Sequence, residues 1–307
     1  MVQISVVIPV FNKGFILNET LNSVLQQIFT NYEIIIINDG STDNSLSVLS
    51  KFEDSRIQIY SQENKGAAAA RNLGIEKSNG EFIAFLDADD YWFPNHLEEL
   101  IKLSEQYPSC GSYCSRYQIK NTKNSVINPV FKDIPQDFNG ILNNYFASNH
   151  PFKINITLNQ MIPKKILIEM NCFTEGITNG QDLELWTKIG IKYPIAVHNK
   201  ITAIYNNYLP NTLSKNSFKT MKLMDFKQFE FEEKENPHLK NFLDFHRIFY
   251  AKHYKIIGNE EKVRFYLNDV ANENLSFMIK VLFKTPSSIL NTLFKLKNWL
   301  LKKGISF

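Results

Sequence analysis

Residues 4–12 read Ile-Ser-Val-Val-Ile-Pro-Val-Phe-Asn, an apolar run that ends in a polar residue. A short, solid run of this kind suits a strand that is buried on both faces, as in a parallel sheet. Similar runs follow at 34–37, 57–60 and 82–86, and segments with helical apolar spacing lie between them. Strands and helices that alternate at this interval predict βαβ units, and so a mainly parallel, Rossmann-like α/β sheet with helices on both faces.

Polar clusters follow three of these runs, at residues 11–14 (Phe-Asn-Lys-Gly), 38–43 (Asn-Asp-Gly-Ser-Thr-Asp) and 87–90 (Asp-Ala-Asp-Asp). Ligands of open α/β sheets bind beyond the carboxyl ends of the strands, so the three clusters describe one rim of one site. The carboxylates at 87–90 repel one another unless a cation lies there, and oxygen ligands suit Mg²⁺ or Mn²⁺ with phosphates and water completing the shell. The alternative is that Asp89 or Asp90 caps the helix expected after Pro94.

Two further parts of the rim, residues 38–43 and 64–72, carry groups that could bind a ligand. Residues 38–43 make a good turn and helix N-cap, but that leaves Asp39 without a role, and its carboxylate can accept a ring N–H from a pyrimidine. Residues 64–72 (Asn-Lys-Gly-Ala-Ala-Ala-Ala-Arg-Asn) place Lys65 and Arg71 at the start of a helix, where anions bind. An ordinary alanine-rich helix packed on the sheet is the alternative. Because a helix that follows a strand starts at the rim, we expect Arg71 to face the site.

The composition excludes disordered and fibrous proteins. The chain has 307 residues, 44% apolar and 21% charged, which is enough for one large or two linked domains. Its formal charge of +3 combines 18 basic and 21 acidic residues up to Lys215 with 16 basic and 10 acidic residues beyond it.

Three cysteines are too few for a disulfide framework and favour a reducing compartment. Cys110 and Cys114 offer two zinc ligands, but no nearby pair completes the set, so we expect buried thiols.

The C-terminal part of the chain has a different character. From residue 216 strand signals vanish and apolar residues recur at helical spacing, which predicts a domain at 1–215 and a helical extension at 216–307. From Asn274 to the end there are six lysines and no acidic residue, and residues 289–303 have an apolar and a polar helical face with Trp299. This basic amphipathic tail either lies on an anionic membrane surface or packs on the preceding domain.

The sequence opens directly into the first strand-like run, without a basic n-region or a small-residue cleavage site, and it has no run of about 18 apolar residues. We therefore expect a cytoplasmic protein whose membrane contact, on the inner face of the cytoplasmic membrane, is peripheral.

The motifs at residues 5–12, 38–43, 64–72 and 85–90, in this order, resemble those of the large family of inverting glycosyltransferases called family 2, whose catalytic domain has the GT-A fold. The resemblance runs to about Ser214. It implies an enzyme that uses a nucleotide-sugar donor, most often a UDP-sugar, together with Mn²⁺ or Mg²⁺. The acceptor would be a hydroxyl of a glycan or a lipid-linked sugar, and the group transferred a hexosyl or N-acetylhexosaminyl unit. Cell-surface polysaccharide biosynthesis is the implied role.

The resemblance also assigns residues to roles. Asp182, at the start of the helix in Gly180-Gln181-Asp182, would be the general base that takes the acceptor proton, and Asp87 and Asp89 would hold the metal. Two stretches depart from the family pattern: Gln181 stands where a Glu is usual, and residues 171–175 (Asn-Cys-Phe-Thr-Glu) replace Gly-Gly-Phe-Asp-Glu, which leaves the acceptor wall unassigned. The residues expected to bind the nucleotide-sugar are Pro9, Val10, Phe11, Asn12, Asp39, Lys65, Arg71, Asp87 and Ala88.

Other classes of function fit less well. A sugar-nucleotide nucleotidyltransferase also binds nucleotides on an α/β sheet, but residues 11–14 lack its Gly-rich and Lys/Arg signature. A non-catalytic nucleotide-sugar-binding module stays open if the changes at 171–181 inactivate the acceptor site. Nucleic-acid binding is disfavoured, because the basic surface is interleaved with aliphatic residues and residues 1–215 are acidic. The sugar, acceptor and linkage depend on residues 121–179, which carry no readable pattern.

Overall fold

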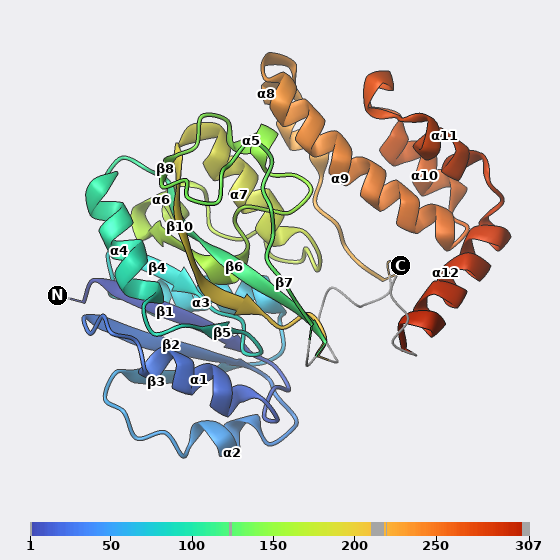
Figure 1. The fold of residues 1–307 in the computed structure, drawn as a ribbon. Coiled ribbons are helices and arrows are strands. Elements are labelled where there is room, and N and C mark those ends of the chain that lie inside the picture. Colours follow the sequence, from blue (N-terminus) through green and yellow to red (C-terminus); the bar gives the residue numbers. More distant parts are fainter. Residues whose placement is uncertain (1, 123–124, 210–217, 219, 303–307) are drawn as a thin grey trace. The chain divides into compact units, whose positions relative to one another are not determined.

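The computed structural model describes residues 2–122, 125–209, 218 and 220–302 (Figure 1). The chain forms two compact units. The N-terminal unit comprises Met1–Lys215 and Lys222–Met224, and the C-terminal unit comprises Asn216–Met221 and Asp225–Phe307. Each unit has its own core.

The N-terminal unit is built on one sheet with the strand order β3-β2-β1-β4-β9-β6-β10-β5. Its first half is parallel, because β1 pairs in parallel with both β2 and β4, and β2 with β3. In the second half β9 runs antiparallel to β4 and β6, while β10 is parallel to β6. The strands are β1 (Ile4–Val10), β2 (Tyr32–Asp39), β3 (Ile57–Gln62), β4 (Phe82–Phe85), β5 (Tyr91–Trp92), β6 (Ser112–Thr122), β7 (Ser125–Ile127), β8 (Gly140–Ile141), β9 (Gln160–Pro163) and β10 (Ile195–Tyr205).

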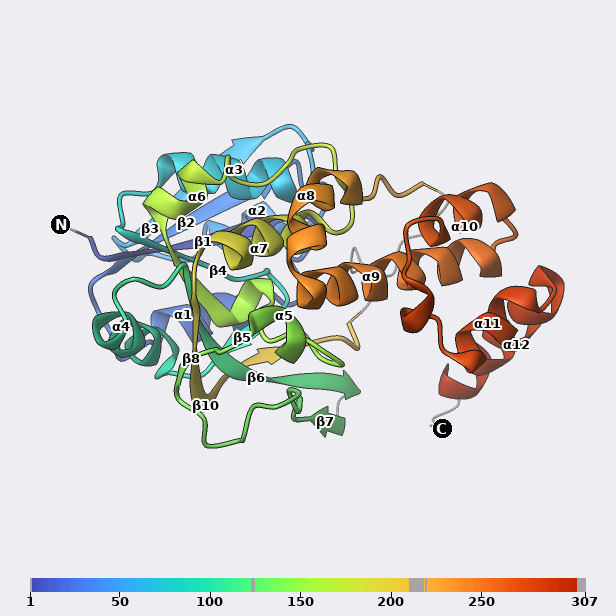
Figure 2. The same cartoon turned by 90° about the horizontal axis from the view of Figure 1, so that it is seen from above.

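Helices cover both faces of this sheet: α3 and α7 lie over one face, and α1 and α4 over the other (Figure 2). The strands β1 and β2 are buried almost throughout, as two-sided coverage requires. Gly74 lets α3 approach β1 closely, since a Cβ at this position would lie 2.2 Å from Cγ1 of Val7. The helices are α1 (Leu17–Leu25), α2 (Ser45–Leu49), α3 (Ala67–Lys77), α4 (His96–Gln106), α5 (Tyr145–Ser148), α6 (Lys164–Glu169) and α7 (Gln181–Lys192).

Two sequence alternatives are decided by local geometry. The helix α4 begins at His96 after Asn95 and has no side-chain cap, so the idea that Asp89 or Asp90 caps it is wrong. Cys110 and Cys114 are free, buried thiols. Burial raises their pKa values to about 11 and about 12, as is usual for thiols packed in a core.

The C-terminal unit is helical in its described residues. Its core is aromatic: Tyr250 and Tyr254 of α9 pack on Tyr266 of α10, with ring centroids 5.5 and 5.7 Å apart, and Phe226 packs on Tyr250. Among the described residues, no helix has both the length and the apolar character needed to cross a membrane. The helices are η3 (Phe226–Phe229), α8 (Glu230–Glu235), α9 (Pro237–Ile256), α10 (Glu260–Leu267), η4 (Asn272–Asn274), α11 (Phe277–Lys284) and α12 (Ser287–Lys302).

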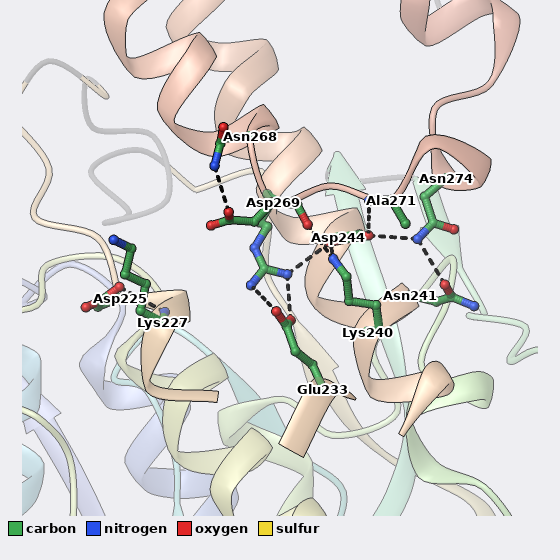
Figure 3. A network of polar contacts seen from close by, with 11 residues as sticks. Asp225, Lys227, Glu233, Lys240, Asn241, Asp244, Asn268, Asp269, Ala271 and Asn274 are labelled. Carbon is green, nitrogen blue, oxygen red and sulfur yellow. Dashed lines mark hydrogen bonds and ion pairs between the residues drawn. The ribbon is translucent and has the colours of Figure 1, made fainter. Parts of the chain in front are cut away.

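A buried ionic network joins α8, α9 and the η4 turn within this unit (Figure 3). Arg247 donates to both carboxylate oxygens of Glu233, at 2.8 and 3.0 Å, and to Asp244 at 2.9 Å. The other oxygen of Asp244 accepts from the backbone N–H of Ala271 and from the amide of Asn274, at 2.9 and 2.8 Å. Because the charged groups are paired and hydrogen-bonded, the network fixes the η4 turn against α9.

Candidate active site

A pocket of about 330 Å³ lies where the sequence clusters were expected to meet, beyond the carboxyl ends of β1, β2 and β4. Thr157, Thr178, Asn179, Gln181 and Tyr205 contribute the part of its wall that comes from the second half of the unit. Asn12 and Lys65, which were expected to bind the nucleotide, do not line it. The expected site residues that do are Pro9, Val10, Phe11, Asp39, Arg71, Asp87, Ala88, Asp89 and Asp182.

Asn12 joins two of the rim loops instead of facing the pocket. Its backbone is in the left-handed region, with φ +52°, which turns its side chain toward the loop after β2. There its amide oxygen accepts from the backbone N–H groups of Thr42 and Asp43 at 2.8 and 3.3 Å, and its own N–H donates to Ser41 at 3.1 Å. Asn12 therefore holds the β1 and β2 loops in a fixed relation.

Asp39 has a role within the chain that its sequence context did not reveal. Its buried carboxylate accepts from the backbone N–H groups of Lys65 and Gly66, both at 2.9 Å, and from the amide of Gln62 at 2.7 Å. These bonds satisfy donors at the entry of α3, where no other side chain caps the helix. Asp39 thus sets the position of the helix that carries Arg71. Its expected contact with a pyrimidine stays a prediction.

Arg71 lines the pocket and has side-chain N–H groups that are available to a ligand. Its guanidinium is 4% exposed, donates through Nη2 to Asp87 at 2.5 Å, and lies over the ring of Phe173 with 5.4 Å between the guanidinium carbon and the centroid. Within the part of the chain that the structure describes, its Nε and Nη1 groups have no hydrogen-bond partner. Buried donors of a charged group are costly to leave unpaired, so this arrangement suits an anionic ligand in the pocket.

One lysine forms an ion pair with the acidic cluster that follows β4. Nζ of Lys13 lies 2.5 Å from Asp89, whose pKa is raised by burial and by the charge of Asp87, although Lys13 opposes the shift. Asp90 is fully buried and accepts from the backbone N–H of Asn206 at 2.9 Å. Burial and the charges of Asp89 and Asp87 raise its pKa well above the usual value. A cation at this cluster would relieve the repulsion.

Two carboxylates of the pocket could serve as the protein ligands of a hard divalent ion. No group of three or more His, Cys, Asp or Glu side chains able to hold a metal occurs among the described residues. Asp87 and Asp89 both line the pocket and supply carboxylate oxygens. Mg²⁺ and Mn²⁺ commonly take one or two protein carboxylates and complete their shells with phosphate and water, so these two residues are sufficient as the protein's share.

Asp182 lies on the opposite wall, in the first turn of α7, where Gly180 turns the chain with φ +90°. Its side chain is 27% exposed, and Nζ of Lys153 lies 4.0 Å from one of its oxygens. Burial raises the pKa of Asp182, but the charge of Lys153, the N–H of Leu183 and the charge of Arg71 outweigh it, so the net pKa is below the usual value. The carboxylate is therefore ionised at neutral pH, as a base must be.

The stretch at 171–175 forms the support under Arg71. Phe173 is buried and packs edge-on against Phe85 and Trp186, with centroids 5.3 and 5.6 Å away. Asn72 clamps it, because its amide oxygen accepts from the N–H of Phe173 and its amide nitrogen donates to the carbonyl, at 3.0 and 2.9 Å. Lys13 belongs to the polar cluster at 11–14, but its ion pair with Asp89 was not foreseen, nor were Lys153 and Phe173 as site residues. These contacts join residues that are 29 to 101 positions apart in the chain.

The sheet order is that of an α/β domain with the GT-A fold. A crystal structure of Staphylococcus aureus TarS residues 1–349 in complex with UDP-GlcNAc has the same fold, with a TM-score of 0.69 at 16% identity over 99% of this chain and 93% of that one. The glycosyl transferase family 2 model matches residues 5–170. The chain therefore belongs to glycosyl transferase family 2, a family of sugar-transferring enzymes, as the motifs predicted.

Curated relatives agree with this assignment. The chain is 29% identical to the Escherichia coli UDP-Glc:alpha-D-GlcNAc-diphosphoundecaprenol beta-1,3-glucosyltransferase WfgD over 278 residues, which are 86% of this chain and 97% of WfgD. It is 36% identical to an uncharacterized glycosyltransferase of Rickettsia bellii over 189 residues, which are 61% of this chain. That match spans only 26% of the Rickettsia protein, so this chain corresponds to about a quarter of its length.

Proposed function

We propose that the protein is an inverting glycosyltransferase that moves a hexosyl or N-acetylhexosaminyl group from a UDP-sugar to a hydroxyl of a lipid-linked or glycan acceptor. The observation that carries this proposal is Arg71, whose unpaired, buried donors lie in one pocket with Asp87, Asp89 and Asp182. A pocket with anion-binding donors and carboxylates on one wall, and an ionised carboxylate on the other, has the parts that glycosyl transfer from a nucleoside diphosphate needs.

The residues of the first wall have three proposed roles: to bind the diphosphate, to position the loop beside the base and to hold a metal ion. Arg71 and Lys13 supply positive charge for the diphosphate, while Asp39 fixes the loop beside the expected base pocket formed by Pro9 and Phe11. Asp87 and Asp89 would hold Mn²⁺ or Mg²⁺, which when bound adds charge stabilisation for the leaving diphosphate.

Asp182 takes the proton of the acceptor hydroxyl as that oxygen forms its bond to the anomeric carbon and the bond to the diphosphate breaks. Because its pKa is low, Asp182 is a weak base, and it accepts the proton late, when the hydroxyl has become acidic by bonding. A single displacement inverts the anomeric centre, so an α-linked donor gives a β-glycoside. The relative WfgD is named as a β-1,3-glucosyltransferase with UDP-Glc as donor and a lipid-diphosphate sugar as acceptor, which supports this choice of substrates.

We place the protein in the biosynthesis of cell-surface polysaccharide, in the cytoplasm, with peripheral contact on the inner face of the cytoplasmic membrane. A lipid-linked acceptor of the WfgD type is embedded in a bilayer through its undecaprenol chain, so an enzyme that uses such an acceptor has to work at the membrane surface. Residues 1–215 would form the catalytic domain and residues 216–307 its extension.

The test is a substrate panel with variants. The full chain is incubated with Mn²⁺, UDP-glucose or UDP-N-acetylglucosamine, and an α-GlcNAc-diphosphate-lipid, and the product linkage is determined by NMR. We expect a β-linked product. Asp89→Ala should lose both transfer and Mn²⁺-dependent UDP binding, whereas Asp182→Asn should lose transfer by roughly a hundredfold or more and keep UDP binding.

Asp54→Asn is the matched control, because Asp54 pairs with Arg56 in a partly exposed loop and does not line the pocket, so its activity should be that of the parent chain. Near-normal turnover of Asp182→Asn would refute the assignment of the base. Failure of every UDP-sugar to bind in the presence of Mn²⁺ would refute the proposed donor.

A further inference from the structure

Two consecutive helices of the C-terminal unit expose large apolar side chains on their surfaces. In α11, Phe277 and Met278 are 78% and 74% exposed, and Val281 is 42% exposed. Phe277 and Val281 are four residues apart and so share one face of the helix, and Met278 borders it. In α12, a second stripe of residues is about half exposed. Its members are Ile289, Leu293, Leu296 and Trp299.

The charged residues next to these apolar stripes are all lysines. Lys280 and Lys284 follow Phe277 by three and seven residues, so they lie on the same side of α11 as Phe277. Lys295 and Lys297 lie on the two sides of the α12 stripe, and all four lysines are exposed. The sequence from Asn274 to Phe307 contains no Asp or Glu. Leu300 and Lys302, which belong to the expected amphipathic pattern, lie outside the side chains that the structure describes.

This combination fits one kind of partner. A lipid surface accepts apolar side chains at the level of the acyl chains and lysines at the level of anionic headgroups, and an acidic side chain there is repelled. We infer that α11 and α12 together form a membrane-docking surface for anionic lipid, in which Phe277, Met278 and Val281 insert and the four lysines contact headgroups. The helix α11, which the sequence pattern did not single out, would make the deeper contact, because its apolar side chains are the more exposed.

The proposed function does not name a membrane-binding surface or a lipid, and this inference names both. It rests on the proposed function in one respect, because a lipid-linked acceptor gives the enzyme a reason to bind a membrane. A lipid-linked acceptor would be presented at the same surface.

Vesicle flotation of the full chain tests it. We expect binding to phosphatidylcholine vesicles that contain about a third phosphatidylglycerol, weak binding to pure phosphatidylcholine, and release by high salt. Phe277→Gln with Met278→Gln should weaken binding by roughly tenfold or more. Lys280→Gln with Lys284→Gln should weaken it by about fivefold for each lysine and reduce its salt dependence. All four side chains are exposed, so these changes should leave the fold intact.

The chain offers a matched control in Phe231, which is 74% exposed on α8 but lies between the acidic residues Glu230 and Glu232. Phe231→Gln should bind vesicles like the parent chain. Equal flotation of the parent and the Phe277/Met278 variant, or no binding to anionic vesicles, would overturn the inference. So would a concentration-dependent dimer that the same variant dissolves, because the face would then be covered by a second copy.

Activity on a water-soluble acceptor separates this inference from the proposed function. The docking variants should transfer sugar to it at the parent rate. Normal flotation without any transfer would refute the proposed function and leave the membrane surface standing.

Discussion

Arg71 gives the sharpest test of the nucleotide pocket. Its guanidinium is buried, one of its nitrogens is paired with Asp87, and two others have no partner in the described chain. In Arg71→Met these donors are removed while the side chain keeps much of its length and its packing over Phe173. Hydrogen bonds from a charged group contribute about 1.5–3 kcal/mol each. Taking the lower value for two donors to the diphosphate gives about 3 kcal/mol, or roughly two orders of magnitude in Kd.

The assay is calorimetric titration of the parent and variant chains with uridine, UMP and UDP. If the unpaired donors serve the phosphates, Arg71→Met should lose affinity for UDP by roughly a hundredfold and leave the weak affinity for uridine nearly unchanged. Arg71→Lys should fall between, since it keeps the charge without the fork of donors. An equal loss for uridine and UDP would mean that Arg71 acts on the base, and an unchanged Kd for UDP would refute the assignment altogether.

Three further changes test the site and the two cores. Lys153→Met removes a positive charge 4.0 Å from Asp182, so the pKa of that carboxyl should rise and the acidic limb of kcat/KM against pH should move to higher pH. An acidic limb that does not move would contradict the pairing. Gly74→Ala places a Cβ 2.2 Å from a methyl of Val7 and should lower the free energy of unfolding in urea by about 1–3 kcal/mol. Arg247→Leu leaves its buried glutamate partner unpaired and should cost about 3–5 kcal/mol by the same measurement, much of it recovered when that glutamate is also made apolar.

The parallel half of the fold could be predicted because its signals are local. The apolar runs at 4–10, 34–37 and 82–85 lie in buried strands, whereas the run at 57–60 lies in β3, which is at the edge of the sheet and only partly buried. Each polar cluster follows the strand that positions it, as with Asp87 after β4. The strand β9 could not be placed in this way. It enters the sheet between β4 and β6 and runs antiparallel to both, and its four residues carry no pattern that distinguishes them from a turn.

Individual roles within the site were harder to predict than membership of it. Asp39 lines the pocket, and its carboxylate also accepts hydrogen bonds from Lys65, Gly66 and Gln62, a second role that its sequence context did not reveal. Asn12 was expected to bind the nucleotide, yet it ties the loop at residues 41–43. A polar side chain at a rim can bind a ligand or shape the loop that does, and sequence spacing alone does not separate the two.

The two walls of the pocket are the one at the ends of β1, β2 and β4 and the one that carries Asp182, and they differ in how far apart in the sequence their residues lie. The first wall comes from the ends of β1, β2 and β4, which are neighbours in the sheet, so short sequence motifs predict it well. The opposite wall comes from Thr157, residues 178–182 and Tyr205, which are brought together by the antiparallel part of the sheet. The family match ends at residue 170, before Asp182 and most of that wall. Membership of the family therefore rests mainly on the wall that we propose to bind the nucleotide.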